Sequence, residues 1–91
     1  MYRVAYTNRM KRDVKLMQKR GKDISKLTKV LSILASGQPL PEKNRDHQLS
    51  GEHAGFRECH IEPDWLLIYI IHESELILTA TATGSHSDLF G

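Results

Sequence analysis

Five histidines are the residues of this 91-residue chain whose side chains are best suited to chemistry, and they stand at positions 47, 53, 60, 72 and 86. Imidazole exchanges protons near neutral pH, so histidines that meet each other or a carboxylate suit general acid–base catalysis. No histidine has another at i+3 or i+4, and the chain has a single cysteine, so the spacing gives only weak support to a metal site. We therefore expect no metal and no other cofactor.

One stretch of the chain joins a polar, histidine-bearing strand to an apolar strand across a turn. Pro63 fixes its own backbone φ and favours an extended residue before it, which places Asp64 in the turn. The apolar run 65–71 is typical of a covered strand. Because side chains alternate along a strand, Glu58 and His60 share one face. An ionisable pair therefore precedes a turn that carries a third ionisable group.

Several of these residues also have a purely structural interpretation. Pro-Asp is common turn chemistry, so Asp64 could serve the turn alone. Arg57 alternates to the other face of its strand, where it is as well placed for a structural ion pair as for a phosphate, unless a bulge near the turn redirects it. His53 and His72 are expected on the surface of a loop and of a hairpin.

The elements that position these side chains follow the order strand, helix, helix, strand, strand, strand. Apolar patterning indicates strands at 2–6, 57–62, 65–71 and 76–83. Helical apolar spacing, with caps at Thr7 or Asn8 and at Asp23, indicates two helices that end at Gly21 and Gly37. The connection 37–54 has no sustained period. The order predicts an α+β domain in which an antiparallel sheet is covered on one face by a helical hairpin.

The composition limits the class of protein. A chain of 91 residues with 40% hydrophobic residues suits a single domain, which we expect to span residues 1–91. The single cysteine excludes an internal disulfide, and the sequence shows no charged leader and no apolar segment of about 18 residues. We expect a reduced, cytoplasmic protein without membrane contact, with Cys59 and Trp65 in its core.

Positive charge is concentrated in the helical half of the chain. Residues 9–29 hold nine basic residues against two acidic ones, a net charge of +7, whereas the remainder holds four basic and nine acidic residues, a net charge of −5. Such a run is often only a solvated surface, but its density along two helices favours a polyanion-facing surface equally well. The candidate RNA-binding residues on this basic surface are Lys11, Lys15, Lys19, Lys22 and Lys26.

Three motifs, in order along the chain, resemble the signature of YafQ-type toxins of the RelE superfamily. They are Asp46-His47-Gln48-Leu49, the stretch from Gly55-Phe56-Arg57-Glu58-Cys59-His60 through Ile61-Glu62-Pro63-Asp64-Trp65 to Tyr69, and Thr83-Gly84-Ser85-His86-Ser87-Asp88-Leu89-Phe90. Lys11-Arg12-Asp13-Val14-Lys15 is similar to the first helix of the family. The resemblance therefore covers nearly the whole chain.

The resemblance implies a ribosome-dependent endoribonuclease that cuts messenger RNA in the aminoacyl site by metal-independent acid–base catalysis. It implies three kinds of partner: a neutralising cognate antitoxin, the ribosome with its messenger, and operator DNA reached only through the antitoxin complex. The implied site residues are His47, His60, Asp64, His86 and Phe90. On this reading His86 is the general acid, Asp64 with His60 supplies the base, and His47 contacts or positions the reacting groups.

Two further substrate contacts are candidates. Phe90 would stack on a base or hold the tail against the site, because aromatic side chains are common platforms for single-stranded RNA. Arg57 would bind phosphate if its side chain reached the site.

Ala82 departs from the family pattern, because YafQ-type toxins typically carry an arginine at this position. An arginine there could donate two hydrogen bonds to the scissile phosphate and stabilise the charge of the phosphorane, which alanine cannot do. The chain is either a natural member that uses another cation, with Arg57 or Arg45 as candidates, or a deliberately inactivated form. The sequence favours the second interpretation, because an active toxin is hard to produce without its antitoxin.

A different class of function is a binding module without catalysis. The same superfamily includes toxins that poison gyrase by binding, and a basic helical hairpin also suits a subunit of a DNA-bound regulatory complex. The set of histidines favours the enzyme, because a toxin that only binds does not need several imidazoles near one turn and the tail.

Overall fold

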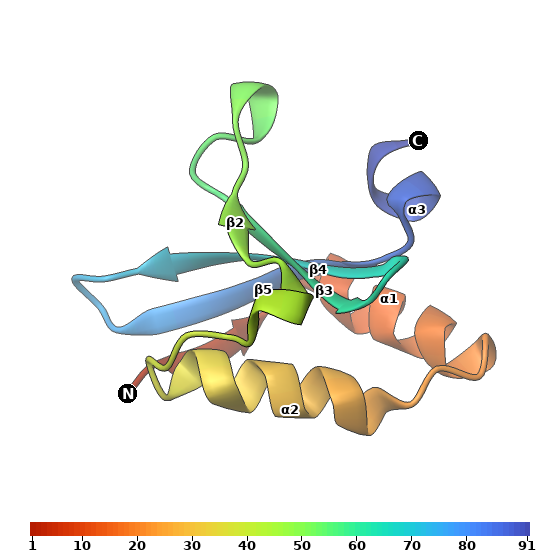
Figure 1. Cartoon of the computed structure of the whole chain (residues 1–91), viewed down its shortest axis with the longest axis horizontal. Coiled ribbons are helices and arrows are strands. Elements are labelled where there is room, and N and C mark those ends of the chain that lie inside the picture. The colour runs from red at the N-terminus through yellow and green to blue at the C-terminus, as the bar shows by residue number, and fades with distance from the viewer.

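The computed structural model describes all residues from 1 to 91. It is an α+β domain with a five-stranded sheet, and Figure 1 shows the helices α1 and α2 on one side of that sheet. The elements in order are β1 (Arg3–Tyr6), α1 (Asn8–Lys19), α2 (Ile24–Ala35), the 3-10 turn η1 (Glu42–Asn44), β2 (His47–Gln48), the 3-10 turn η2 (Gly51–His53), β3 (Arg57–Glu62), β4 (Trp65–His72), β5 (Ile77–Gly84) and α3 (His86–Phe90). The predicted α+β class is confirmed, and the predicted strands and helices occur in the predicted order, with β2 and α3 in addition.

The sheet has the strand order β1-β5-β4-β3-β2. The pairs β3–β4 and β4–β5 are antiparallel, as predicted, and so is the added pair β2–β3, but β1 pairs with β5 in parallel. The prediction of a wholly antiparallel sheet is therefore wrong at this edge. Alternation in a sequence does not specify the direction of pairing, and the two helices after β1 form the long connection that parallel pairing requires.

Both helices begin at the caps that the sequence indicates. The Thr7 side chain accepts a hydrogen bond from the backbone of Met10, and Asp23 accepts one from the backbone of Ser25. These acceptors satisfy amide groups that have no partner inside the helix. The positions of the caps fix which faces of α1 and α2 turn toward the sheet.

The hydrophobic core lies between these helices and one face of the sheet. Its members are Met10, Met17, Leu27, Val30, Leu31, Leu34, Cys59, Trp65, Leu67, Tyr69, Leu78 and Ala80. Trp65 is fully buried and its indole N–H donates to Thr83 Oγ1 at 2.9 Å. Burial raises the pKa of the Cys59 thiol to about 12, so this cysteine is a core residue rather than a nucleophile.

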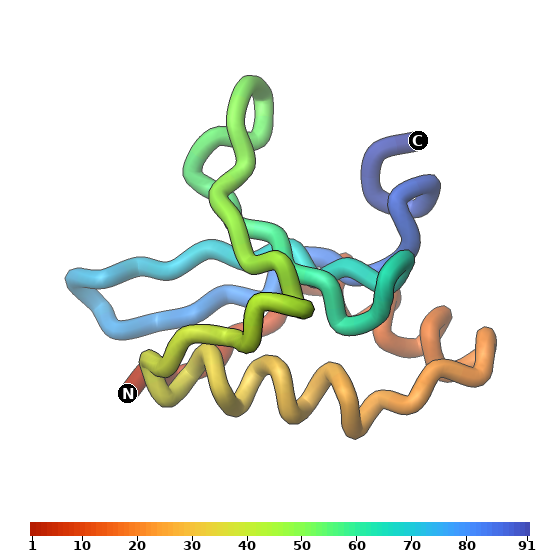
Figure 2. The backbone as a smooth tube through the Cα atoms, in the orientation of Figure 1, coloured from red at the N-terminus to blue at the C-terminus, as the bar shows by residue number.

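Two segments rise from the opposite face of the sheet, which we call the open face. Figure 1 shows β2 with η2 on one side of it and α3 on the other, and Figure 2 shows the same two arms as bare backbone. Sequence analysis predicts no element in either segment, because each is too short for a periodic pattern. None of the α-helices combines the length and the apolar character that a membrane-spanning segment needs.

Candidate active site

Strand register brings residues far apart in sequence into one row across the open face. His47 pairs with Glu58, Glu58 with Ile68, and Ile68 with Ala82. Directly paired residues in a sheet point to the same side. Ala82, the position at which the resemblance leads us to expect an arginine, therefore shares a face with His47 and Glu58, and it is only 2% exposed.

Glu58 lies between two of the predicted histidines. Its side chain is 7% exposed, and its Oε1 atom is 3.4 Å from His47 Nε2 and 3.7 Å from His60 Nε2. A buried carboxylate is costly unless it is paired, so these imidazoles are its natural partners. The sequence analysis placed Glu58 on the same face as His60 but not among the site residues. The alternation of β3 was the signal that could have identified it.

The ring nitrogens of His47 and His60 are divided between two tasks. Nδ1 of His47 donates to the carbonyl oxygen of Arg45 at 2.7 Å, and Nδ1 of His60 donates to that of Pro63 at 3.2 Å. A carbonyl oxygen can only accept, so Nδ1 carries the hydrogen in both rings. The Nε2 atoms, which face Glu58, are therefore the positions that can exchange a proton.

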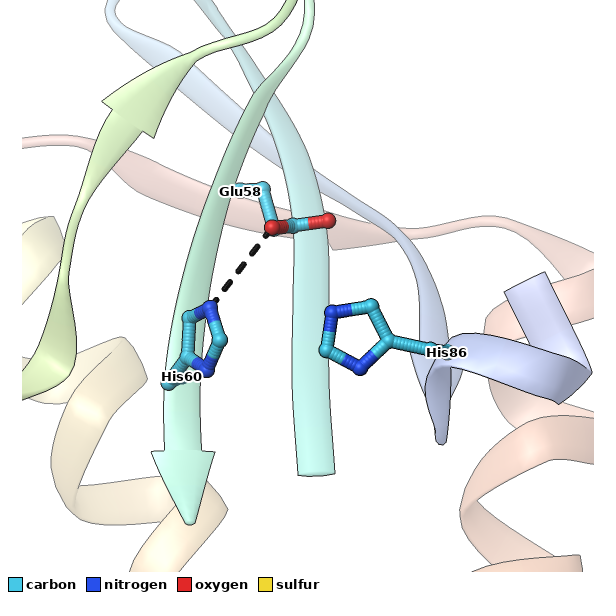
Figure 3. A group of neighbouring side chains, drawn as sticks. All are labelled: Glu58, His60 and His86. Carbon is cyan, nitrogen blue, oxygen red and sulfur yellow. Dashed lines mark ion pairs between the residues drawn. The ribbon is translucent and has the colours of Figure 1, made fainter. Parts of the chain in front are cut away.

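His86 reaches the same cluster from α3, and Asp64 holds it there. Asp64 Oδ1 accepts hydrogen bonds from the backbone N–H of His86 at 3.0 Å and from its Nδ1 at 2.8 Å. Both hydrogen bonds lower the pKa of Asp64, and the bond from the backbone N–H has the larger effect. Figure 3 shows the ring of His86 facing His60 and Glu58, and the centroids of the two imidazoles are 5.8 Å apart.

This pairing differs from the predicted one. The sequence analysis joined Asp64 to His60, whereas the structure joins Asp64 to His86 and places His60 beside Glu58. The register shift between His60 and Glu62 bends the end of β3, so the turn presents Asp64 to α3 instead of to its own hairpin strand.

Phe90 lies at the rim of the site. It is 42% exposed, and its ring meets that of His53 edge to face at a centroid distance of 5.4 Å. The sequence analysis placed His53 on a loop surface without a role. The contact arises because the arm with η2 and the arm with α3 approach each other over the open face.

Arg57 does not reach this cluster. Its Nε atom donates to Tyr69 Oη at 3.2 Å and lies 3.4 Å from Asp46 Oδ1, while Tyr69 Oη donates to the same Asp46 oxygen at 2.5 Å. Burial raises the pKa of Tyr69, so the phenol stays neutral. These contacts anchor the segment before His47. Arg57 therefore has the structural role that the sequence analysis left open and does not lie beside the histidines.

Two other cations lie beside His60. A cleft of about 400 Å³ opens there, and its other lining residues are Lys43, Arg45, Ile61, Glu62 and Pro63. Lys43 and Arg45 are exposed and form no ion pair. Arg45 has a left-handed backbone (φ 47°), and its carbonyl oxygen is the group that orients His47. Strained conformations of this kind persist where the surrounding structure requires them.

The predicted basic surface divides into two groups. Lys22 and Lys26 both pair with Glu62, at 3.0 Å and 2.8 Å, so one carboxylate partly neutralises them. Lys11, Lys15 and Lys19 are exposed and form no ion pair.

The cluster could also hold a metal ion. One ligand atom each from Glu58, His60 and His86 lies within 4.8 Å of the others. Imidazole and carboxylate together suit zinc and copper. Sequence spacing missed this set because its members come from two strand positions and a helix 26 residues apart in the chain, from 60 to 86.

Comparison with known proteins agrees with the geometry. A family model described as the bacterial toxin of type II toxin–antitoxin systems, YafQ, matches residues 2–91. The chain is 42% identical over 89 residues to the mRNA interferase toxin YafQ of Escherichia coli K12, covering 97% of this chain and 95% of that protein.

Two solved structures are also similar. The toxin in the crystal structure of the E. coli DinJ–YafQ complex has a TM-score of 0.90 and 39% identity, with full coverage of both chains. A metal-bound toxin from Helicobacter pylori has a TM-score of 0.93 and 42% identity, covering 99% of this chain and all of that one. A match over nearly the whole length in both sequence and structure establishes descent, and this chain belongs to the YafQ family of bacterial type II toxin–antitoxin toxins.

Proposed function

We propose that this chain is an endoribonuclease that cleaves messenger RNA in the aminoacyl site of the ribosome by acid–base catalysis. One observation supports the proposal above all others. His47, His60 and His86 come from three separate elements, each fixes Nδ1 on an oxygen acceptor, and the rings of all three lie around the buried Glu58 carboxylate. A surface used only for binding has no need of such an arrangement.

His60 and His86 divide the proton transfers. His60 Nε2 accepts the proton of the ribose 2′-hydroxyl, whose oxygen then attacks the phosphorus atom. His86 donates a proton to the departing 5′-oxygen, so the products are a cyclic phosphate and a free 5′-hydroxyl. Asp64 stays ionised and accepts from Nδ1 of His86, which orients the acid. Glu58 lies beside Nε2 of His60, where its negative charge stabilises the imidazolium that forms when this atom takes the proton.

Arg45 and Lys43 supply positive charge in place of the arginine that the resemblance leads us to expect at position 82. They line the cleft beside His60, and neither has a carboxylate partner, so both are free to bind a phosphate. Phosphorane charge needs preorganised donors. Ala82, buried in the same row as Glu58, offers none. This placement favours a natural toxin that uses another cation over a deliberately inactivated form.

Phe90 and the basic surface position the substrate. The exposed ring of Phe90 stands at the rim, where a base of single-stranded RNA can stack on it. Lys11, Lys15 and Lys19 meet ribosomal RNA, and Lys22 and Lys26 contribute less because Glu62 shares their charge.

An antitoxin encoded with the toxin neutralises it. The similar E. coli toxin is known in a complex with DinJ. We infer that this chain binds a protein of the same kind and reaches operator DNA only through that complex.

A transition metal ion would occupy the same nitrogen atoms that move protons. Two of the similar H. pylori toxin structures are described as metal-bound and copper-bound. In this chain Glu58, His60 and His86 would hold the ion, which would act as a Lewis acid but would remove the imidazole lone pairs from acid–base use. Such an ion is therefore an inhibitor of the proposed reaction and not its cofactor.

The decisive experiment incubates the purified protein with a defined messenger, with and without translating ribosomes. We expect cleavage within the aminoacyl-site codon only when ribosomes are present. The variant His86→Gln keeps a polar side chain but cannot deliver a proton, so its single-turnover rate should fall by about 100-fold or more while ribosome affinity stays the same.

Testing the Ala82→Arg variant in parallel distinguishes a toxin inactivated at position 82 from a protein that is not an endoribonuclease. If neither the native chain nor Ala82→Arg cuts messenger on ribosomes, the enzyme proposal fails. Supercoiling of DNA by gyrase in the presence of the protein then tests the binding-toxin alternative.

A further inference from the structure

The helix α3 carries His86 and Phe90 but is only five residues long. A helix of this length is not stable by itself in water. It also makes no contribution to the hydrophobic core, since none of its residues is buried. Its position must therefore come from polar contacts with the rest of the fold.

Asp88 is the centre of those contacts. Its side chain accepts hydrogen bonds from Arg20 Nη1 at 2.6 Å and Nη2 at 3.0 Å, one to each carboxylate oxygen. The Oδ2 atom also accepts from the backbone N–H of Ser85 at 2.8 Å, and the Ser85 hydroxyl oxygen accepts from the backbone N–H of Asp88 at 3.1 Å. One carboxylate thus caps α3 and ties it to the end of α1, where Arg20 is the C-cap.

Two further contacts fix the same place. Arg9 Nη2 lies 3.4 Å from the carbonyl oxygen of Asp88, so a second arginine of α1 reaches α3. Gly84, the last residue of β5, has no room for a side chain, because a Cβ there would lie 2.8 Å from the Cβ of Asp88. The strand end and α1 therefore enclose Asp88 from two sides.

The helix is held at two points that have different effects. Asp64, on the turn between β3 and β4, holds His86 at the first residue of α3, but the side chains of Asp64 and His86 are 68% and 57% exposed. Because both Asp64 bonds go to this first residue, they leave the direction of the rest of the helix unset. The second attachment, at Asp88, removes that freedom because a bidentate guanidinium pair fixes direction as well as distance.

We propose that Arg20 is a positioning residue for the proton donor: by clamping Asp88 it fixes α3, and so holds the ring of His86 toward Glu58 and His60. Arg20 touches no reacting atom. The inference rests on the proposed function for its effect on cleavage, but the placement of α3 can be measured without any cleavage. The clamp also gives Arg20 a task separate from the binding of ribosomal RNA by the basic surface.

The test compares Arg20→Ala, Arg20→Lys and Asp88→Asn with Arg3→Ala, which removes an exposed arginine of β1 that forms no ion pair. Misplacement of a catalytic group by about 1 Å costs about 100-fold in rate, so a partly released α3 should slow single-turnover cleavage by about 10- to 100-fold. Ribosome affinity of Arg20→Ala should stay within about twofold of Arg3→Ala, because loss of one phosphate contact changes affinity little. Arg20→Lys should recover part of the rate, because it restores one charged donor.

Hydrogen exchange of the His86 and Leu89 backbone amides supplies the readout that needs no ribosome. Both amides are hydrogen-bonded, to Asp64 and to Ser85, and both should exchange faster in Arg20→Ala and Asp88→Asn than in Arg3→Ala. Asp88→Asn keeps an oxygen acceptor for the cap, so it remains informative if Arg20→Ala does not fold.

The possible results of these measurements lead to different conclusions about the Arg20–Asp88 clamp. Unchanged exchange and an unchanged single-turnover rate in both Arg20→Ala and Asp88→Asn would overturn the clamp. Equal losses of affinity and rate would assign Arg20 to RNA binding and also overturn it. If the native chain never cuts messenger but exchange rises as expected, the clamp stands as a structural feature and the proposed enzyme function fails.

Discussion

Asp64 holds His86 by two hydrogen bonds to a single oxygen atom, one from the backbone N–H at 3.0 Å and one from Nδ1 at 2.8 Å. The first bond fixes where α3 begins, and the second fixes how the imidazole is turned. A residue that the sequence presents as a turn former is thereby also the group that aims the histidine of the C-terminal helix at the cluster around Glu58.

Replacing Glu58 with glutamine tests whether its charge organises the imidazoles. Gln keeps the shape of the side chain but lacks the negative charge that stabilises a protonated imidazole, so we expect cleavage on ribosomes to slow by about 10- to 100-fold. Glu52→Gln in the exposed η2 turn is the matched control and should retain full activity. A Glu58→Gln protein with the native single-turnover rate would show that the buried charge is irrelevant to catalysis.

A double-mutant cycle between Arg45 and Ala82 tests the source of phosphate-binding charge. Arg45→Ala in the native chain should reduce the cleavage rate by about 100-fold or more, the usual effect of losing one stabilising donor. In the Ala82→Arg background the same change should cost much less, because the new guanidinium takes over the charge.

The two interpretations of Ala82 predict different results in that cycle. If Ala82→Arg alone raises the rate by orders of magnitude and Arg45→Ala has no effect in either background, the chain is an inactivated form and Arg45 is only a surface residue. Arg3→Ala serves as the control for loss of general positive charge.

Charge reversal separates the two groups of lysines on the basic surface. Changing Lys11, Lys15 and Lys19 together to glutamate should weaken ribosome binding by at least about 10-fold and reduce its dependence on salt. Reversing Lys22 and Lys26 should weaken it less, although it also places two new carboxylates beside Glu62. Ribosome affinities are measured by sedimentation at several salt concentrations. Equal binding by the native protein and both variants would show that the basic surface does not bind ribosomal RNA.

The Arg20–Asp88 pair should make stability depend on acid pH. Hydrogen bonds from Arg20, followed by that from the backbone of Ser85, hold the pKa of Asp88 well below its usual range. A lowered pKa stabilises the folded state above the unfolded value of about 3.9, and that contribution is lost as pH falls through the folded value. The native chain should therefore unfold at a higher temperature than Asp88→Asn at pH 7, and the difference should shrink below about pH 4. A difference that is constant from pH 7 to the acid limit would contradict the pairing.

A chelator and an added metal should act in opposite ways on the proposed reaction. We expect EDTA, corrected for the magnesium that ribosomes need, to leave cleavage unchanged and copper or zinc to inhibit it. Calorimetry on the free protein should show binding that His60→Gln removes and His53→Gln, outside the cluster, preserves. Cleavage that disappears with the chelator and returns with zinc would make the ion a cofactor instead of an inhibitor.

The sequence by itself determined the longer elements and their faces. Thr7 and Asp23 cap helices because their side chains bond to amides two or three residues away, and Pro63 makes a turn through its own ring. The alternation that puts Glu58 beside His60 is equally local. The three motifs also indicated His47, His60, Asp64 and His86, and the structure brings these four to one face of the sheet.

Only the tertiary structure determined which side chains contact each other. Asp64 meets His86 across 22 positions of sequence, and Arg20 meets Asp88 across 68. Neither pair leaves a periodic signal, because each depends on the register of β3, β4 and β5 and on the docking of α1. The parallel pairing of β1 and the anchoring of Arg57 away from the cluster have the same origin. Local patterns specify which way a side chain points from its own backbone, whereas its partner is chosen by the packing of elements that the chain brings together from a distance.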